Sequence, residues 1–118
     1  MNIIGTEITL TRGTEVPLIM EVSDIGDLTE WDVTFTMRAT LTSSGDPICQ
    51  YTSEDEALSV DEDEVTVDLS ETDTWAIPEN VEQVYIQLNF SKEDRAVATE
   101  IYALDVAKNL MKVEVSNG

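Results

Sequence analysis

Apolar and polar side chains alternate with a period of two along most of this chain. The clearest run covers residues 31–41, where the apolar positions are Trp31, Val33, Phe35, Met37, Ala39 and Leu41. Runs of the same period cover residues 16–22, 65–69, 84–90 and 102–106, with shorter ones at Ile8–Leu10 and Leu110–Val115. Because successive side chains of a strand point to opposite faces, this period predicts strands that are buried on one face.

Turn signals separate these runs. Gly13 in Arg12-Gly13-Thr14 and the segment 43–47 predict connections, and residues 48–51 are expected to pair back as a short arm. Pro17 is expected at a strand beginning or a sheet edge, because proline cannot donate to a ladder. Residues 53–64 are expected to form an acidic loop around Leu58 and Val60, and residues 91–95 a polar turn.

A short helical turn is predicted after Ser70. Ser70 is a typical capping residue, acids follow it in the first turn, and Pro78 limits the length of the turn. Trp75 and Ile77 are expected to close that end of the core.

The pattern as a whole indicates an all-β protein. Roughly seven to eight short strands with one short helical turn are typical of an antiparallel immunoglobulin-like β-sandwich, and a small barrel is the alternative. A parallel sheet would need crossover helices, for which no helical stripe is present. Residues 1–118 are expected to form a single domain, because no linker, repeat or low-complexity tract interrupts them.

The charge limits the partners. The chain of 118 residues has 25 acidic and 6 basic residues, no histidine and a formal charge of −19. Such a surface repels phosphate backbones and anionic membranes, so neither nucleic acid nor membrane is an expected partner. The N-terminus lacks the basic start and apolar core of a signal peptide, which predicts synthesis in a cytoplasm.

The sequence predicts no enzyme, no catalytic, cofactor-binding or metal residues and no cofactor. Cys49 is the only cysteine and has no histidine to activate it, so it is interpreted as structural. The acids at 54–56 and 61–64 lack the glycine and spacing of a calcium loop, which leaves opportunistic cation binding open. Two features point to neighbouring proteins instead: Tyr85 is out of phase with its strand, and Thr9, Thr11, Thr34, Thr36 and Thr40 form uncharged outer faces.

Three segments resemble a known family. They are Leu10-Thr11-Arg12-Gly13-Thr14-Glu15-Val16-Pro17-Leu18, the stretch from Gly26-Asp27-Leu28-Thr29 to Arg38, and Val67-Asp68-Leu69-Ser70-Glu71-Thr72-Asp73-Thr74-Trp75. Together they are similar to immunoglobulin-like domains of bacteriophage tail and baseplate proteins, with the closest likeness to the N-terminal domain of phage baseplate upper proteins. The resemblance implies adhesion between parts of a virion and carries no catalytic residues.

The resemblance and the alternating pattern together predict a structural component of a bacteriophage or phage-like particle. The protein is expected in the virion, in the tail, the baseplate or as a head decoration, packed against other virion proteins and copies of itself. Two alternatives stay open at this point. One is an acidic DNA mimic that inhibits a host nucleic-acid-binding protein, and the other is a carbohydrate- or protein-binding module.

Overall fold

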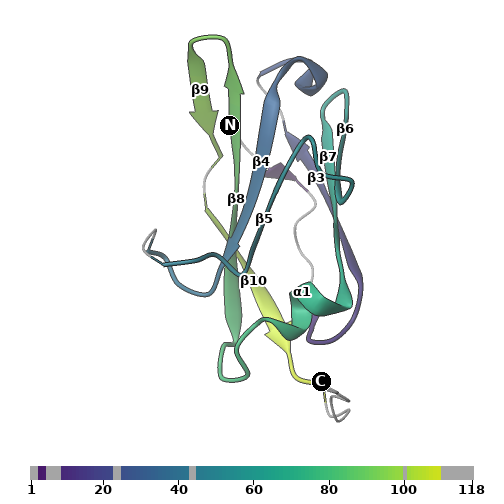
Figure 1. Ribbon diagram of the computed structural model, residues 1–118, viewed down its shortest axis with the longest axis vertical. Coiled ribbons are helices and arrows are strands. Elements are labelled where there is room, and N and C mark those ends of the chain that lie inside the picture. The colour runs from purple at the N-terminus through teal and green to yellow at the C-terminus, as the bar shows by residue number, and fades with distance from the viewer. Residues whose placement is uncertain (1–2, 5–8, 23–24, 43–44, 100, 110–118) are drawn as a thin grey trace.

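The structure is a computed structural model that describes residues 3–4, 9–22, 25–42, 45–99 and 101–109 (Figure 1). Two helical segments are present in these residues, the 3-10 turn η1 (Leu28–Glu30) and the helix α1 (Glu71–Trp75). The strands are β1 (Ile3–Ile4), β2 (Thr9–Thr11), β3 (Val16–Val22), β4 (Asp32–Arg38), β5 (Cys49–Thr52), β6 (Leu58–Asp61), β7 (Glu64–Leu69), β8 (Gln83–Lys92), β9 (Arg95–Ala98) and β10 (Tyr102–Ala107).

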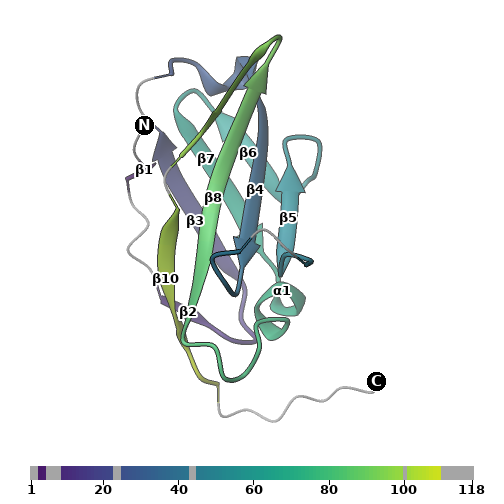
Figure 2. The ribbon, with the colours of Figure 1, turned by 90° about the vertical axis from the view of Figure 1, so that its left-hand side faces the viewer.

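The strands form two sheets that face each other as two layers (Figures 1 and 2). One sheet has the order β1-β3-β7-β6, and the other has the order β2-β10-β8-β4-β5. Strand β9 also pairs with β8, along residues 89–92, whereas β10 pairs with β8 along residues 83–86. All pairs are antiparallel except β2 with β10. This arrangement is an immunoglobulin-like β-sandwich, as the alternating pattern predicts.

The core lies between the sheets and consists of the in-phase apolar residues. Those of β3, β4, β7 and β8 are all buried: Val16, Leu18, Met20, Val22, Val33, Phe35, Met37, Val65, Val67, Leu69, Val84, Ile86, Leu88 and Phe90. Together with residues such as Leu10, Trp31, Ile77 and Leu104 they form one cluster. The assignment of residues 1–118 to one domain stays a prediction.

The predicted inward position of Leu41 is wrong. Its side chain is 67% exposed, because β4 ends at Arg38. Pairing with β5 ends at Met37 and pairing with β8 at Arg38, so no partner strand holds the next residues on the inner face. Pro17 is the second residue of β3, which confirms its prediction as a strand beginning.

Three strands occupy segments without a predicted strand. Strand β6 lies inside the predicted acidic loop 53–64, with Leu58 buried, and folds back onto β7 through a tight turn in which Glu62 has φ +51°. Strand β9 follows the turn predicted at 91–95, and β1 lies near the N-terminus. In all three the alternating run is only two to four residues long, too short to be distinguished from a loop by period. The predictions for Ile8, for residues 43 and 44 and for 110–115 lie outside the described residues.

The predicted helical turn is confirmed as α1, and it carries a complete capping box. The Asp73 N–H donates to Ser70 Oγ over 3.1 Å, and the Ser70 N–H donates to Asp73 Oδ2 over 2.9 Å. Asp73 Oδ2 also accepts the Tyr51 hydroxyl at 2.6 Å, which ties β5 to the start of the helix. The pair satisfies backbone donors that a helix start would otherwise leave without partners.

The turn between β2 and β3 is bound to α1. The N–H groups of Gly13 and Thr14 donate to Thr74 Oγ1 over 2.9 and 3.0 Å, and that hydroxyl donates to the Thr14 carbonyl over 2.8 Å. Arg12 Nε donates to the Ile77 carbonyl over 2.9 Å, and its guanidinium lies 5.1 Å from the Trp75 ring centroid. Because β2 and β3 belong to different sheets, these contacts join both sheets at one end of the sandwich. Ile77 is buried there as predicted, whereas Trp75 is half-buried.

Candidate interaction surface

The outer face of the four-stranded sheet carries acids side by side. Glu21 of β3 lies opposite Glu64 of β7, and Glu64 lies opposite Asp61 of β6. Opposite residues share a face, so these three carboxylates form one row across the sheet, which we call the acidic row. A single row of this kind is not the regular double row that a DNA mimic would need, so the face gives that alternative no support.

The outer face of the six-stranded sheet has a different composition. Its central residues on β4, β5 and β8 are Thr34, Thr36, Gln50, Thr52, Tyr85, Gln87 and Asn89. Two acids, Asp32 and Asp105, point outward near opposite ends of this face, and the described residues at its centre include none. In a chain with 25 acids, an extended surface without a carboxylate is where another protein can approach without electrostatic repulsion.

A shallow hollow of about 240 Å³ lies in this face. Two exposed apolar side chains border it, Leu41 at 67% and Ile101 at 50% exposure. We call the hollow and its border the neutral face, which consists of Thr36, Arg38, Thr40, Leu41, Thr42, Gln50, Tyr85, Ile86, Gln87, Asn89 and Ile101. Among these described residues Arg38 is the one charged side chain.

Hydrogen bonds hold several polar groups of the neutral face. Thr36 Oγ1 donates to Gln50 Oε1 over 3.1 Å, across the β4–β5 pair. Arg38 Nη1 donates to the Gly45 carbonyl over 3.0 Å, and Gln87 Nε2 donates to the Thr99 carbonyl over 2.9 Å. Side chains that are held in place before binding lose less conformational entropy when a partner covers them.

Tyr85 lies out of phase with the buried residues of its strand, as the sequence predicts. It is half-buried, on the outer side of β8, and it borders the neutral face. Whether a partner covers it stays a prediction. Ile101 also has the opposite parity to the inward residues of β10, so the alternation in the sequence indicates that its side chain points outward. Leu41 carried no such signal, because the alternation from Trp31 places it on the inner face.

Cys49 and Tyr51 occupy the inner side of β5, half-buried against the core. Burial raises the pKa of the Cys49 thiol to about 12, and the negative charge of Asp73 acts in the same direction. Burial and the hydrogen bond to Asp73 likewise raise the pKa of Tyr51. Both groups are therefore neutral at pH 7, and a thiol with so high a pKa is a poor nucleophile.

The acidic segments have structural roles in the described chain. Asp55 Oδ2 accepts the Thr52 N–H at 2.8 Å, and the carbonyls of Glu62 and Asp63 accept the N–H groups of Leu28 and Val22. Among the described residues, no group of three or more acids or cysteines is arranged to hold a metal ion. No helix of this part of the chain is long and apolar enough to span a membrane.

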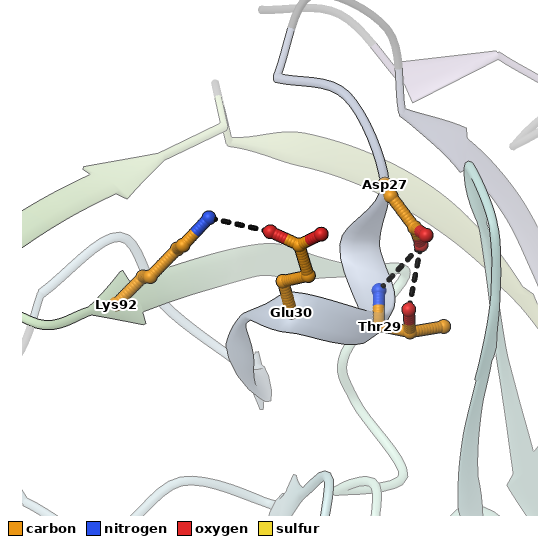
Figure 3. A network of polar contacts seen from close by, with 4 residues as sticks. All are labelled: Asp27, Thr29, Glu30 and Lys92. Atoms are coloured by element: carbon orange, nitrogen blue, oxygen red, sulfur yellow. Dashed lines mark hydrogen bonds and ion pairs between the residues drawn. The ribbon is translucent and has the colours of Figure 1, made fainter.

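At the end of the sandwich opposite α1, two cationic side chains lie close to the Trp31 ring. Lys92 Nζ lies 2.7 Å from Glu30 Oε1 (Figure 3). It also lies 5.6 Å from the Trp31 ring centroid, and the Arg95 guanidinium lies 5.2 Å from the same ring. Asp27 begins η1 by accepting the Thr29 hydroxyl and N–H, and these two bonds lower the pKa of its carboxyl (Figure 3). Trp31 itself is buried and packs edge-on against Phe90. We therefore interpret the side chains around its ring as a cover for this end of the core.

Comparison with known proteins adds little to this picture. No protein-family model matches the chain, and no curated protein is significantly similar to it. Among solved structures, the chain is similar to the extracellular domain of the voltage-gated sodium channel beta4 subunit, which forms parallel homodimers with a role in cell–cell adhesion. The two are 13% identical over 89% of this chain and 92% of the other, with a TM-score of 0.37. At that distance the match does not bear on function.

Proposed function

We propose that this protein is a structural component of a bacteriophage or phage-like particle, and that it acts by docking its neutral face onto a neighbouring protein. The resemblance of residues 10–18, 26–38 and 67–75 to phage tail and baseplate domains supports the particle. The single observation that carries the docking is that no carboxylate is among the described residues of the neutral face.

The geometry explains how such a face would hold a neighbour. Leu41 and Ile101 supply exposed apolar area, and burying it stabilises a contact by roughly 25 cal/mol per Å². Tyr85 supplies a ring of the kind that is enriched at interfaces. The acidic row lies on the outer face of the other sheet, so its three carboxylates point away from the contact.

Two matched substitutions test the proposal. Ile101 and Ile19 are the same residue type with 50% and 49% exposure, but Ile19 points outward from the four-stranded sheet. Ile101→Glu adds a charge at the neutral face and is expected to reduce co-sedimentation with purified particles by about tenfold, as one unpaired interface charge can. Ile19→Glu adds the same charge at the opposite face and is expected to leave co-sedimentation unchanged.

The thermal midpoints of both variants should stay near that of the wild type, because both positions are exposed. Mass spectrometry of the purified particles supplies the second measurement and should detect the wild-type chain at a constant ratio to other virion proteins. Equal losses from both substitutions, or absence of the chain from washed particles, would contradict the proposal.

A further inference from the structure

One edge of β9 carries no paired strand among the residues that the structure describes. In the described chain β9 pairs only with β8, in the register Ala96 to Ser91, Val97 to Phe90 and Ala98 to Asn89. The Thr99 N–H donates to the Leu88 carbonyl over 3.0 Å. Since backbone groups alternate along a strand, residues 95, 97 and 99 bond toward β8, and the N–H and C=O groups of Ala96 and Ala98 point away from it.

At two other sheet edges a hydrogen bond within the chain already occupies one outward N–H group. At the β5 edge, the outward N–H of Thr52 donates to Asp55 Oδ2 over 2.8 Å. At the β6 edge, the Leu58 N–H donates to the Asp55 carbonyl over 3.2 Å, and the strand ends in Asp61. Strand β9 has neither an acid nor a proline, and Ala96 and Ala98 are exposed. Edges of this kind accept a further strand readily, which is why proteins usually block them.

We propose that β9 pairs with β9 of a second copy of this chain, antiparallel, about a two-fold axis that passes beside Val97. This register places Ala96 opposite Ala98 of the second copy, and Ala98 opposite Ala96. Both pairs are of the hydrogen-bonded type, so the four outward N–H groups of the two copies each find a carbonyl. The contact joins the two six-stranded sheets edge to edge.

Packing on both faces of the joined sheet agrees with this register. On the inner face Val97 is half-buried against the core, opposite Phe90, which in turn lies opposite Val33. In the dimer, Val97 of the second copy would cover the exposed part of this side chain. On the outer face the neighbours of Ala96 and Ala98 are Ser91 and Asn89. A hollow of about 260 Å³ at these residues leaves the outer side clear of bulky groups.

The sequence of the segment favours a second copy as the occupant. Each copy has a formal charge of −19, so two copies meet most easily where no carboxylates oppose each other. The register places Arg95 opposite Thr99, whereas the residues next in sequence on either side of the segment, Asp94 and Glu100, are both acidic, so repulsion between carboxylates acts at its two ends. A two-fold contact also needs a surface that is complementary to itself, and the alternation of Ala96, Val97 and Ala98 meets that condition. This inference goes beyond the proposed function and uses residues outside the neutral face.

Charge variants of the isolated protein test the register. In Ala96→Glu/Ala98→Glu and in Ala96→Lys/Ala98→Lys, the pairing brings two like charges together at both positions. In Ala96→Glu/Ala98→Lys it brings Glu opposite Lys twice and keeps the net charge at that of the wild type. Sedimentation velocity is measured up to about 1 mM protein in about 0.5 M NaCl, where the Debye length is only a few Å and the net charge is screened.

The wild type is expected to dimerise with a dissociation constant on the order of 0.1–1 mM, because the contact is small. The Glu/Lys variant should dimerise at least as well, whereas the two like-charged variants should dimerise about tenfold more weakly. Weakening in the Lys/Lys variant matters most, because that variant has less net charge than the wild type. Hydrogen exchange at the amides of Ala96 and Ala98 should slow only at concentrations where the dimer forms.

A wild type that stays monomeric to about 1 mM would overturn the inference. Dimerisation that is equal in all four proteins, or that leaves the two alanine amides unprotected, would also overturn it. Ile101→Glu should dimerise like the wild type, since residue 101 lies outside the paired segment. Loss of particle binding in that variant with intact dimerisation would therefore bear on the neutral face alone.

Discussion

Gly13 shows how one residue determines the contact between the β2–β3 turn and α1. Its φ of +82° is a conformation that favours glycine, and a Cβ placed there would overlap the Trp75 ring. The resemblance to phage domains includes the segment Arg12-Gly13-Thr14, and the structure assigns that segment a structural role. Arg12 and Thr14 hold the loop, and the missing side chain of Gly13 makes room for the ring.

Gly13→Ala is expected to lower the free energy of unfolding by about 2–4 kcal/mol, the sum of a left-handed backbone strain and an overpacked contact. Gly26→Ala is the matched control, because Gly26 also has φ +82° but nothing within 4 Å of its Cβ position. It should cost only the backbone part, about 1–2 kcal/mol. Urea unfolding at pH 7 measures both, and equal losses would show that Trp75 does not contact this glycine.

At the scale of the element, the acidic row is a local destabilising feature of the four-stranded sheet. Glu64 has a carboxylate opposite it on each side, at Glu21 and Asp61, and like charges that are directly opposite disfavour pairing. Asp68 lies on the same strand and the same face but opposite Pro17. Glu64 and Asp68 therefore share a strand and a face, but only Glu64 has carboxylates opposite it.

Glu64→Gln is expected to raise the free energy of unfolding by roughly 0.5–1 kcal/mol at low salt, because it removes two repulsive pairs. Asp68→Asn, the control, should change it by less than about 0.5 kcal/mol, as is usual for a surface substitution. The gain from Glu64→Gln should shrink in about 1 M NaCl, where charges are screened. A gain that is the same at both positions would mean that net charge, not the row, is responsible.

The elements differ in how well the sequence predicts them. Long runs of alternation predict strands β3, β4, β7 and β8. A capping residue before α1 and a proline after it predict the helix, so local chemistry predicts all five elements. Strands β6 and β9 are four residues long and depend on the neighbours β7 and β8, which the local pattern does not contain. The inward phase predicted for Leu41 fails for the same reason, since the partner strands end before it.

For the whole molecule, the two sheets differ in charge on their outer faces. Thr34, Thr36 and Tyr85 indicate an uncharged surface in the sequence, but the pairing of β4 with β8 brings them together. Leu41 and Ile101 are 60 residues apart and border one hollow only because the fold closes in this way. The neutral face is therefore a property of the topology, which the sequence predicts in part.

The same division of charge explains how a strongly acidic chain could take part in an assembly of many copies. The acidic row repels other copies, while the described residues of the neutral face and residues 95–98 of β9 include no carboxylate. Association is then directed to particular surfaces, as repeated contacts in symmetric assemblies require.

Site-specific photocrosslinking in intact particles tests the central claim most directly. A photoreactive side chain at residue 87, in the neutral face, is compared with the same group at residue 66, which is paired with Ile19 on the opposite sheet. We predict that the probe at residue 87 crosslinks to a neighbouring virion protein in the particle fraction and that the probe at residue 66 does not. Crosslinks from residue 66 alone, or from neither residue in particles that contain the protein, would contradict the account.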